Sequence, residues 1–355
     1  MPIDPITDWV RARGSVTFAE FMDRCLHDPE VGYYASQVPG PRGDFETAPT
    51  LSPLFGRCLA RCVEAMWVGL ERPDPLTVTE IGGGDGSLAR SVAASSIPEI
   101  ALAWRFVERH AAVAEAQRQA MSGRRASWFG SPADAGPGAG VVLANEVVDS
   151  FPVHLLEVAE DGVREAYVSA SADGLSWIWG EPSDSRLADG LPDTPGRYEA
   201  RPASGPWLRE VAAIVDRGYL VVIDYGDPRP QIWEGRPEGT LLAYRDGHPS
   251  PDLLALPGRQ DLTAHVDFTV LDEAAEDAGL RRVWAGTQRD FLLTWGLRRD
   301  LEELRARAER ATGAEALRLH AARGAAAVLA GSMGGFRVHV WGRDVPDPDP
   351  AHVED

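Results

Sequence analysis

Apolar runs of strand length alternate along the chain with segments of helical periodicity, which is the pattern of an α/β protein. The runs at 140–145 and 218–224 are apolar almost throughout, as strands buried on both faces of a parallel sheet are. Further strands are predicted at 76–80, 103–108, 126–129, 281–287 and 335–342, with helices between most of them. The chain therefore reads as a largely parallel sheet covered by helices.

Two regions break this alternation. Between 153 and 179, three short stretches of alternating polarity are separated by Asp-Gly pairs, which are turn signals. This predicts a small antiparallel β insertion over about 153–205. The region from about 290 to 330 is rich in Ala, Arg and Glu and predicts a helical addition. These features lie within a main domain over 71–343.

Both ends of the chain differ from the main domain. Residues 1–70 predict a helical N-terminal arm, in which Thr17 and Glu20 have the spacing of a capping box. The last stretch, 344–355, is rich in Pro and Asp and is expected to form a disordered tail.

A glycine-rich turn follows the first predicted strand of the main domain. In the stretch TVTEIGGGDGSLA, from Thr77 to Ala89, glycines occupy positions 82, 83, 84 and 86. Glycine permits positive φ and close approach of a ligand, and the following helix offers free N–H groups at its start. Such a turn commonly holds a nucleotide-like cofactor, with Gly82, Gly84 and Gly86 as the candidate contacts.

The acid before this turn discriminates between cofactors. Glu80 stands two residues before Gly82, where a carboxylate would repel the pyrophosphate of a dinucleotide. S-adenosylmethionine (SAM) has no phosphate and carries an ammonium and a sulfonium, so Glu80 favours SAM. An NAD-dependent oxidoreductase remains the alternative, because Gly84-Asp-Gly86-Ser-Leu-Ala89 also fits the dinucleotide pattern.

Other strand ends supply further cofactor candidates. Glu108 ends the second strand, where an acid commonly accepts hydrogen bonds from ribose hydroxyls. Asp134 follows the weak strand at 126–129, where an adenine would lie, and Asn145 ends the strand at 140–145.

Candidate catalytic groups follow the same strand ends. Glu146 and Asp149 are three residues apart, so they can face one site and bind a cation, or one of them can act as a base. His154 and Tyr225 are further candidate bases, although a lone His before an apolar strand is more often structural. Helix N-terminal acids without a catalytic role are the alternative for Glu146 and Asp149.

Composition narrows the partners. The formal net charge is −19, which disfavours nucleic acid and anionic membranes as partners. The three cysteines form no C-x-x-C pair and no His cluster accompanies them, so no metal site is expected. The N-terminus lacks an apolar signal core and no run of 18 apolar residues occurs, which predicts a cytoplasmic protein.

Several blocks in the same order make the chain similar to the MidA-type family of SAM-dependent methyltransferases, which includes a mitochondrial complex I assembly factor. The resemblance covers nearly the whole chain outside the tail. The blocks are HDPEVGYY at 27–34, GDF at 43–45 through SPLFG at 52–56, Glu80–Gly86, NEVVDSFPVH at 145–154, IDYG at 223–226, DLTAHVDF at 261–268 and TQ at 287–288 with FLL at 291–293.

This resemblance implies a Rossmann-like, seven-stranded class I methyltransferase sheet with the N-terminal arm over the cofactor. It implies that Gly43, Asp44 and Thr47 of the arm lie near SAM, together with Gly82 and Glu108. It also implies a protein arginine side chain as the methyl acceptor. A homodimer is compatible with the sequence, which does not fix the oligomeric state.

The chain departs from the family pattern at two positions. Thr50 stands where the family usually has a glutamate, and Gly83 stands where it usually has proline. Thr50 removes an acid from the arm, which keeps open an O- or N-methyltransferase acting on a small molecule or peptide. A non-catalytic assembly factor that retains the fold is the remaining alternative, against which the intact Glu80, Glu108 and Asp149 argue.

Overall fold

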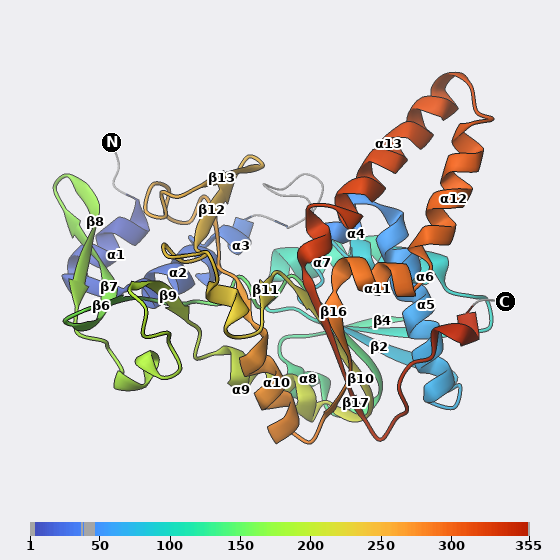
Figure 1. Cartoon of the computed structure of the whole chain (residues 1–355), viewed down its shortest axis with the longest axis horizontal. Coiled ribbons are helices and arrows are strands. Elements are labelled where there is room, and N and C mark those ends of the chain that lie inside the picture. Colours follow the sequence, from blue (N-terminus) through green and yellow to red (C-terminus); the bar gives the residue numbers. More distant parts are fainter. Residues whose placement is uncertain (1–3, 37, 39–46, 354–355) are drawn as a thin grey trace.

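A seven-stranded sheet forms the centre of the molecule, in a computed structural model that describes residues 4–36, 38 and 47–353 (Figure 1). The strand order is β16–β17–β10–β5–β2–β3–β4, and within this sheet β17 alone runs antiparallel to its neighbours. This confirms the predicted seven-stranded fold. The strands are β16 (Arg281–Thr287), β17 (Arg337–Arg343), β10 (Val215–Asp224), β5 (Gly138–Asn145), β2 (Leu76–Ile81), β3 (Leu102–Val107) and β4 (Ala126–Phe129).

Helices cover both faces of this sheet, because the central strands are apolar on both sides. Val78, Leu143 and Val221 pack in one cluster with α5 (Pro53–Gly69) and α6 (Ser87–Ser95). Val142 and Val222 pack in a second cluster with helices on the other face. These are α9 (Ser204–Ala213) and α10 (Phe268–Asp277); the short α8 (Pro132–Ala135) lies near α9, and α7 (Ala111–Ala120) follows β3.

The N-terminal arm and the β insertion form one lobe with a shared core (Figure 1). The arm contributes a short strand that the sequence does not predict, β1 (Ser15–Thr17), which pairs with β7. The capping box is confirmed, since the Thr17 hydroxyl accepts from the Glu20 N–H at 3.2 Å and the Glu20 carboxylate accepts from the Thr17 N–H at 2.9 Å. The lobe contains α1 (Pro5–Arg13), α2 (Phe18–His27), α3 (Tyr33–Ser36), β6 (His154–Ala159), β7 (Gly162–Ser171), β8 (Gly174–Gly180), β9 (Gly196–Ala200), β12 (Leu242–Arg245), β13 (His248–Ser250) and β14 (Asp261–Thr263).

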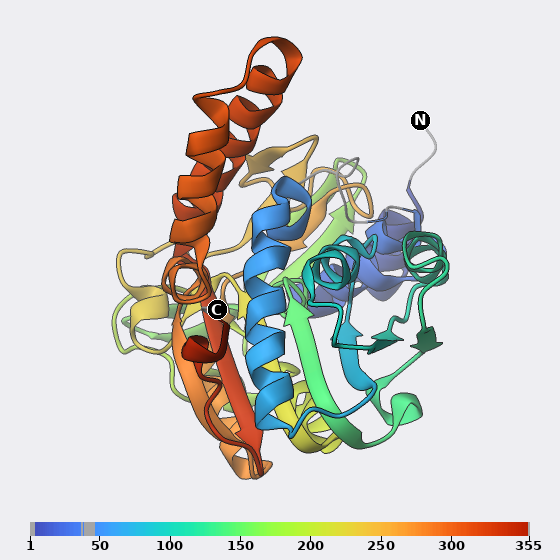
Figure 2. The same ribbon diagram turned by 90° about the vertical axis from the view of Figure 1, so that its right-hand side faces the viewer.

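A helical hairpin projects from the opposite end of the molecule (Figures 1 and 2). It consists of α12 (Leu297–Ala308) and α13 (Gly313–Ala330), preceded by α11 (Gln288–Thr294). No helix in the described ranges is both long and apolar enough to cross a membrane.

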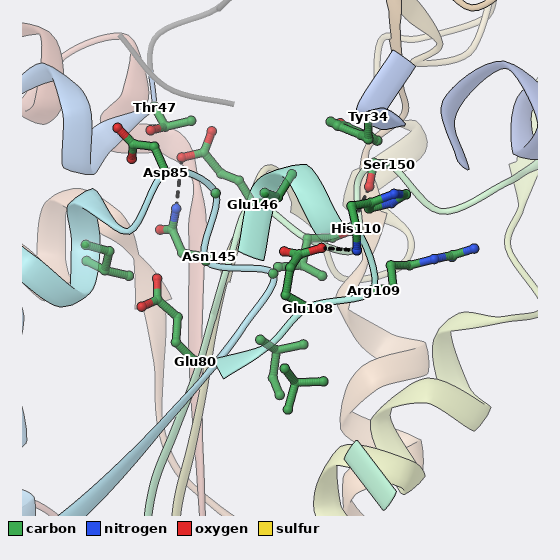
Figure 3. Close-up of a pocket in the computed structure, with 18 of the residues that line it drawn as sticks. Tyr34, Thr47, Glu80, Asp85, Glu108, Arg109, His110, Asn145, Glu146 and Ser150 are labelled. Carbon is green, nitrogen blue, oxygen red and sulfur yellow. Dashed lines mark hydrogen bonds between the residues drawn. The ribbon is translucent and has the colours of Figure 1, made fainter. Parts of the chain in front are cut away.

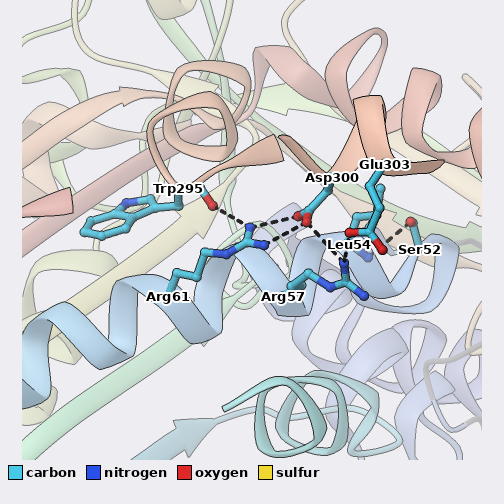
Figure 4. A network of polar contacts seen from close by, with 7 residues as sticks. All are labelled: Ser52, Leu54, Arg57, Arg61, Trp295, Asp300 and Glu303. Carbon is cyan, nitrogen blue, oxygen red and sulfur yellow. Dashed lines mark hydrogen bonds and ion pairs between the residues drawn. The ribbon is translucent and has the colours of Figure 1, made fainter. Parts of the chain in front are cut away.

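A buried acid joins this hairpin to the main domain (Figure 4). The Asp300 side chain is 1% exposed and forms two hydrogen bonds with the Arg61 guanidinium of α5, at 2.7 and 2.8 Å. Arg57 adds a third contact to Asp300 at 3.1 Å, and Arg61 also donates to the Trp295 carbonyl at 2.9 Å.

The last described residues differ from the expected disordered tail. The Tyr219 hydroxyl donates to the Pro346 carbonyl at 2.8 Å, and Asp347 pairs with Arg281 at 2.7 Å. The 3₁₀ turn at Pro350–Val353 lies against α5. Composition alone missed this segment because its order comes from contacts with distant elements.

Candidate active site

A crevice lies at the carboxyl ends of β2, β3 and β5, bounded by the glycine turn (Figure 3). Gly82, Gly84 and Gly86 have φ values of 63°, 49° and 79°, which explains their identity. Position 83 requires glycine for a steric reason, because a Cβ there would lie 2.9 Å from the Cδ of Glu80. Glycine at 83 therefore leaves room for the acid beneath the turn.

Glu80 lies in the wall of this crevice with an unsatisfied oxygen. Glu80 is 2% exposed, and its Oε2 atom has no hydrogen-bond partner within the described part of the chain. Burial, followed by the nearby charge of Asp85, raises its pKa to about 8. A buried oxygen without a partner is costly, so this carboxyl group is suited to a cationic ligand atom.

Glu108 enters the same crevice from the end of β3. One carboxylate oxygen accepts from the His110 N–H at 2.8 Å and the other accepts from the Gln117 amide at 3.3 Å. These bonds hold the carboxylate in place and leave lone pairs free for two vicinal hydroxyls. Burial raises the pKa of Glu108.

Glu146 stands at the end of β5 in a strained conformation. Its φ is 54°, and its carboxylate accepts from the Asn145 amide at 3.0 Å and from the Ala48 N–H at 3.4 Å. Burial, followed by the charge of Asp149, raises its pKa to about 8. A non-glycine residue at positive φ costs free energy and is often found where function requires the side chain.

Asp149 is held by a network behind the crevice. The Tyr225 hydroxyl donates to its Oδ2, whereas its Oδ1 is buried and has no partner among the described residues. Asp224, at the end of β10, accepts from the N–H groups of 147, 148 and 149 at 3.2, 2.9 and 3.3 Å. Arg201 donates to the Asp149 carbonyl at 3.1 Å. The hydrogen bonds of Asp224 and Arg201 therefore hold in place the loop that carries Glu146 and Asp149.

Aromatic side chains of the arm close another part of the crevice. His27 and Tyr34 are stacked with ring centroids 5.6 Å apart, and His110 lies 5.8 Å from each of them. The Tyr34 hydroxyl donates to Asp261 at 2.9 Å. The sequence analysis named none of these three as site residues, and the available signal was that His27 and Tyr34 belong to the HDPEVGYY block.

The structure brings most of the predicted site residues together. Those that line the crevice are Thr47, Glu80, Gly82, Gly84, Glu108, Asn145, Glu146 and Asp149. Gly86 is the last glycine of the turn and the N-cap residue of α6, and the hydroxyl of Tyr225 bonds to Asp149 without lining the crevice itself. Gly43 and Asp44 fall outside the described residues.

Two candidates lie elsewhere. His154 is on β6, where its Nδ1 atom pairs with Glu165 at 2.6 Å, so the proposal of His154 as a base is corrected. Its side chain contacts Glu165 of the neighbouring strand β7, and His154 does not line the crevice. Asp134 is exposed and accepts from the hydroxyl of Ser131, the N-cap residue of its own short helix. It does not line the crevice, although its neighbour Pro132 does.

The raised pKa of Glu80 predicts a pH dependence of stability. A carboxyl group with a folded-state pKa near 8 stabilises the fold fully below its ordinary value of 4.5, and this contribution is lost as the pH rises through about 8. We expect the free energy of unfolding of the ligand-free protein to fall less steeply between pH 6 and 8 in Glu80→Gln than in the parent, measured by urea unfolding. The exposed acid Glu115 gives the control, since Glu115→Gln should keep the parental slope. An unchanged slope in Glu80→Gln would contradict the assignment.

The buried groups fit SAM. Glu80 is placed for a cationic group, Glu108 for ribose hydroxyls, and the buried unpartnered Oδ1 of Asn145 offers one more acceptor. When bound, SAM supplies an activated methyl group.

Comparison with known proteins agrees with this geometry. Residues 58–286 match the model of the family described as S-adenosyl-L-methionine-dependent methyltransferase, Methyltransf_28. A COG1565 superfamily member from Burkholderia thailandensis, whose crystal structure contains S-adenosyl-homocysteine, is 29% identical in sequence to this chain. The two structures match with a TM-score of 0.84 over 98% of this chain and 94% of that one.

Curated relatives are also similar over most of their length. The mitochondrial protein arginine methyltransferase NDUFAF7 homolog of Drosophila melanogaster is 28% identical over 76% of this chain and 69% of the relative. The homolog of Caenorhabditis elegans is 28% identical over 84% and 77%.

These relatives correct one expectation. They are named mitochondrial, which contradicts the cytoplasmic location predicted from the sequence. The prediction rested on the lack of an apolar signal core, but mitochondrial targeting segments are amphipathic and rich in Arg, so that criterion does not address them.

Proposed function

The chain belongs to a family of S-adenosyl-L-methionine-dependent methyltransferases, and from this premise we propose that it methylates an arginine side chain of a protein. The names of the curated relatives, which are protein arginine methyltransferases, support this acceptor. The observation that carries the proposal is the pair of acids that follow β5, of which Asp149 is buried and Glu146 is half-buried. Neither Glu146 nor Asp149 has an ion-pair partner in the described part of the chain, although both line the crevice.

A guanidinium group matches this pair. It carries five N–H donors and a positive charge, so one carboxylate can orient it while the other neutralises it. A neutral acceptor could donate a hydrogen bond to the unpartnered Asp149 Oδ1 but would supply no positive charge to balance the carboxylate. We therefore place the guanidinium of the acceptor between Glu146 and Asp149. Asp224 and Arg201 hold the loop that carries these two acids.

The same acids account for the proton that methylation releases. A guanidinium pKa exceeds about 12, so an N–H proton must be removed as the new N–C bond forms. Glu146, whose pKa is raised to about 8, is suited to accept that proton because an effective base has a pKa near the working pH. Tyr225 keeps Asp149 oriented towards the acceptor by donating to its Oδ2.

Thr50 favours a second candidate, a small molecule or peptide acceptor. It lines the crevice, and its hydroxyl accepts from the Thr47 N–H at 3.1 Å and donates to the Thr47 carbonyl at 2.9 Å. A threonine here leaves the rim of the crevice with one acid fewer than the family pattern, which weakens selection for a cationic protein segment.

Transfer of labelled methyl groups into a lysate distinguishes the two acceptors. We expect label in the protein fraction, and methylarginine after acid hydrolysis of that fraction. Label confined to small molecules would support the second candidate, and label on another amino acid would contradict the arginine proposal. The chain contains no lysine, so any labelled methyl-lysine in the protein fraction would come from a protein other than the enzyme itself.

A further inference from the structure

Strand β8 (Gly174–Gly180) is a free sheet edge in the N-terminal lobe. Within the described ranges it pairs with β7 alone, and no strand lies along its other side (Figure 1). A free edge presents unpaired N–H and C=O groups that can bind another strand.

This edge lacks the usual protection. Its sequence, GLSWIWG, contains no charged residue and no proline. Trp177 and Ile178 are 36% and 43% exposed, which places them among the exposed large apolar residues of the described chain. Proteins normally guard edges with charges, proline or bulges, so an unguarded edge of seven residues indicates a contact surface.

The β7–β8 turn determines which backbone groups face outwards. Ser171 and Gly174 are paired across a two-residue turn, and the two residues that close such a turn form a hydrogen-bonded pair. Because hydrogen-bonded residues alternate along an antiparallel strand, the even positions of β8 bond to β7. The N–H and C=O groups of Leu175, Trp177 and Trp179 therefore point to the free side.

We propose that a second copy of this chain pairs with β8, antiparallel and centred on Trp177. In this register Trp177 lies opposite Trp177 of the second copy, and Leu175 lies opposite its Trp179. All three outward-facing residues then find hydrogen-bonding partners, and Gly174 lies opposite Gly180 at each end. The sheets of the two copies become continuous across a two-fold axis.

The charges around the strand support a second copy over an acceptor segment. The seven residues bring no like charges opposite each other, and aromatic cross-strand pairs are favourable. The edge also has no acid that would select an arginine-bearing segment, and no β8 residue lines the crevice. Beyond the strand ends, Asp173 faces Glu181 of the second copy, so added salt should strengthen the association by screening this pair.

Proline at position 177 tests the pairing. Trp177→Pro removes an outward N–H without removing a bond to β7, whereas the matched variant Trp177→Val loses the same ring and keeps the N–H. In light scattering after size exclusion, we expect the parent and Trp177→Val to approach twice the 38.4 kDa chain mass as concentration rises. Trp177→Pro should stay at the mass of one chain.

A second variant keeps the test decisive if the proline disturbs folding, which circular dichroism and SAM binding would reveal. Ile178→Lys changes an exposed side chain and places a charge on the paired surface, so it should also give single chains. A parent that stays at 38.4 kDa at every concentration overturns the proposal. Dimers of Trp177→Pro as stable as those of Trp177→Val overturn it as well, and so does a single-chain parent that binds acceptor peptides through β8.

Discussion

Replacing Glu146 by glutamine and Asp149 by asparagine is expected to lower the methyl-transfer rate by roughly 100-fold or more, while SAM affinity stays unchanged. Both substitutions keep the side-chain shape and remove the negative charge. The acceptor then loses the charge that orients its guanidinium and the base that takes its proton. Steady-state rates with a saturating cofactor, together with calorimetric titration of SAM, measure the two effects separately.

The pH profile separates the two acids. If Glu146 is the base, the parental rate should rise with pH towards about 8 and then level off, since the group must be ionised to accept a proton. Glu146→Gln should remove this rise with pH. Tyr225→Phe should lower the rate at every pH but keep the rise, because Tyr225 only positions Asp149. Asp134→Asn, outside the crevice, is the matched control. Full rates in both Glu146→Gln and Asp149→Asn with unchanged SAM binding would refute the assignment.

Replacing Asp300 by alanine is expected to reduce the free energy of unfolding by about 3 kcal/mol. The Asp300 side chain is 1% exposed, and its removal leaves the mostly buried Arg61 without its carboxylate partner. Urea unfolding at constant pH measures the loss, and hydrogen exchange should show it first in α12. Glu303 provides the control, because its contact with Arg57 is 3.8 Å long and solvent-exposed, so Glu303→Gln should cost less than about 0.5 kcal/mol.

A compensating replacement tests the cause of that loss. If an uncompensated charge on Arg61 dominates, the double variant Arg61→Met with Asp300→Leu should recover much of the stability of the parent. A double variant as unstable as Asp300→Ala would instead assign the loss to packing of the hairpin on α5.

Local patterns made the sheet and the cofactor side of the site predictable. The glycine turn and Glu80 are adjacent in the chain, so spacing alone placed them at one strand end. Glu146 and Asp149 follow an apolar strand, and the parallel sheet carries such ends to a common crevice. These inferences need only period, charge and topology.

Residues whose roles depend on distant partners could not be predicted in this way. Asp224 closes the predicted strand at 218–224, but its four N–H donors come from its own neighbour Tyr225 and from a loop 75 to 77 residues earlier. The stack of His27, Tyr34 and His110 joins two lobes. His154 was misjudged because its partner, Glu165, is fixed only by the pairing of β6 with β7.

The strained backbone of Glu146 has a consequence for the history of the family. A φ of 54° suits glycine, so replacing Glu146 by glycine would relieve a cost of about 1 kcal/mol or more. Selection on this backbone strain alone would favour losing the glutamate, whereas under the proposed function selection for methyl transfer opposes that loss. In a lineage that kept the fold as a scaffold but gave up the reaction, glycine is expected to appear at this position early. Under the proposed function, a glutamate here is the expected mark of a lineage in which the reaction is still under selection.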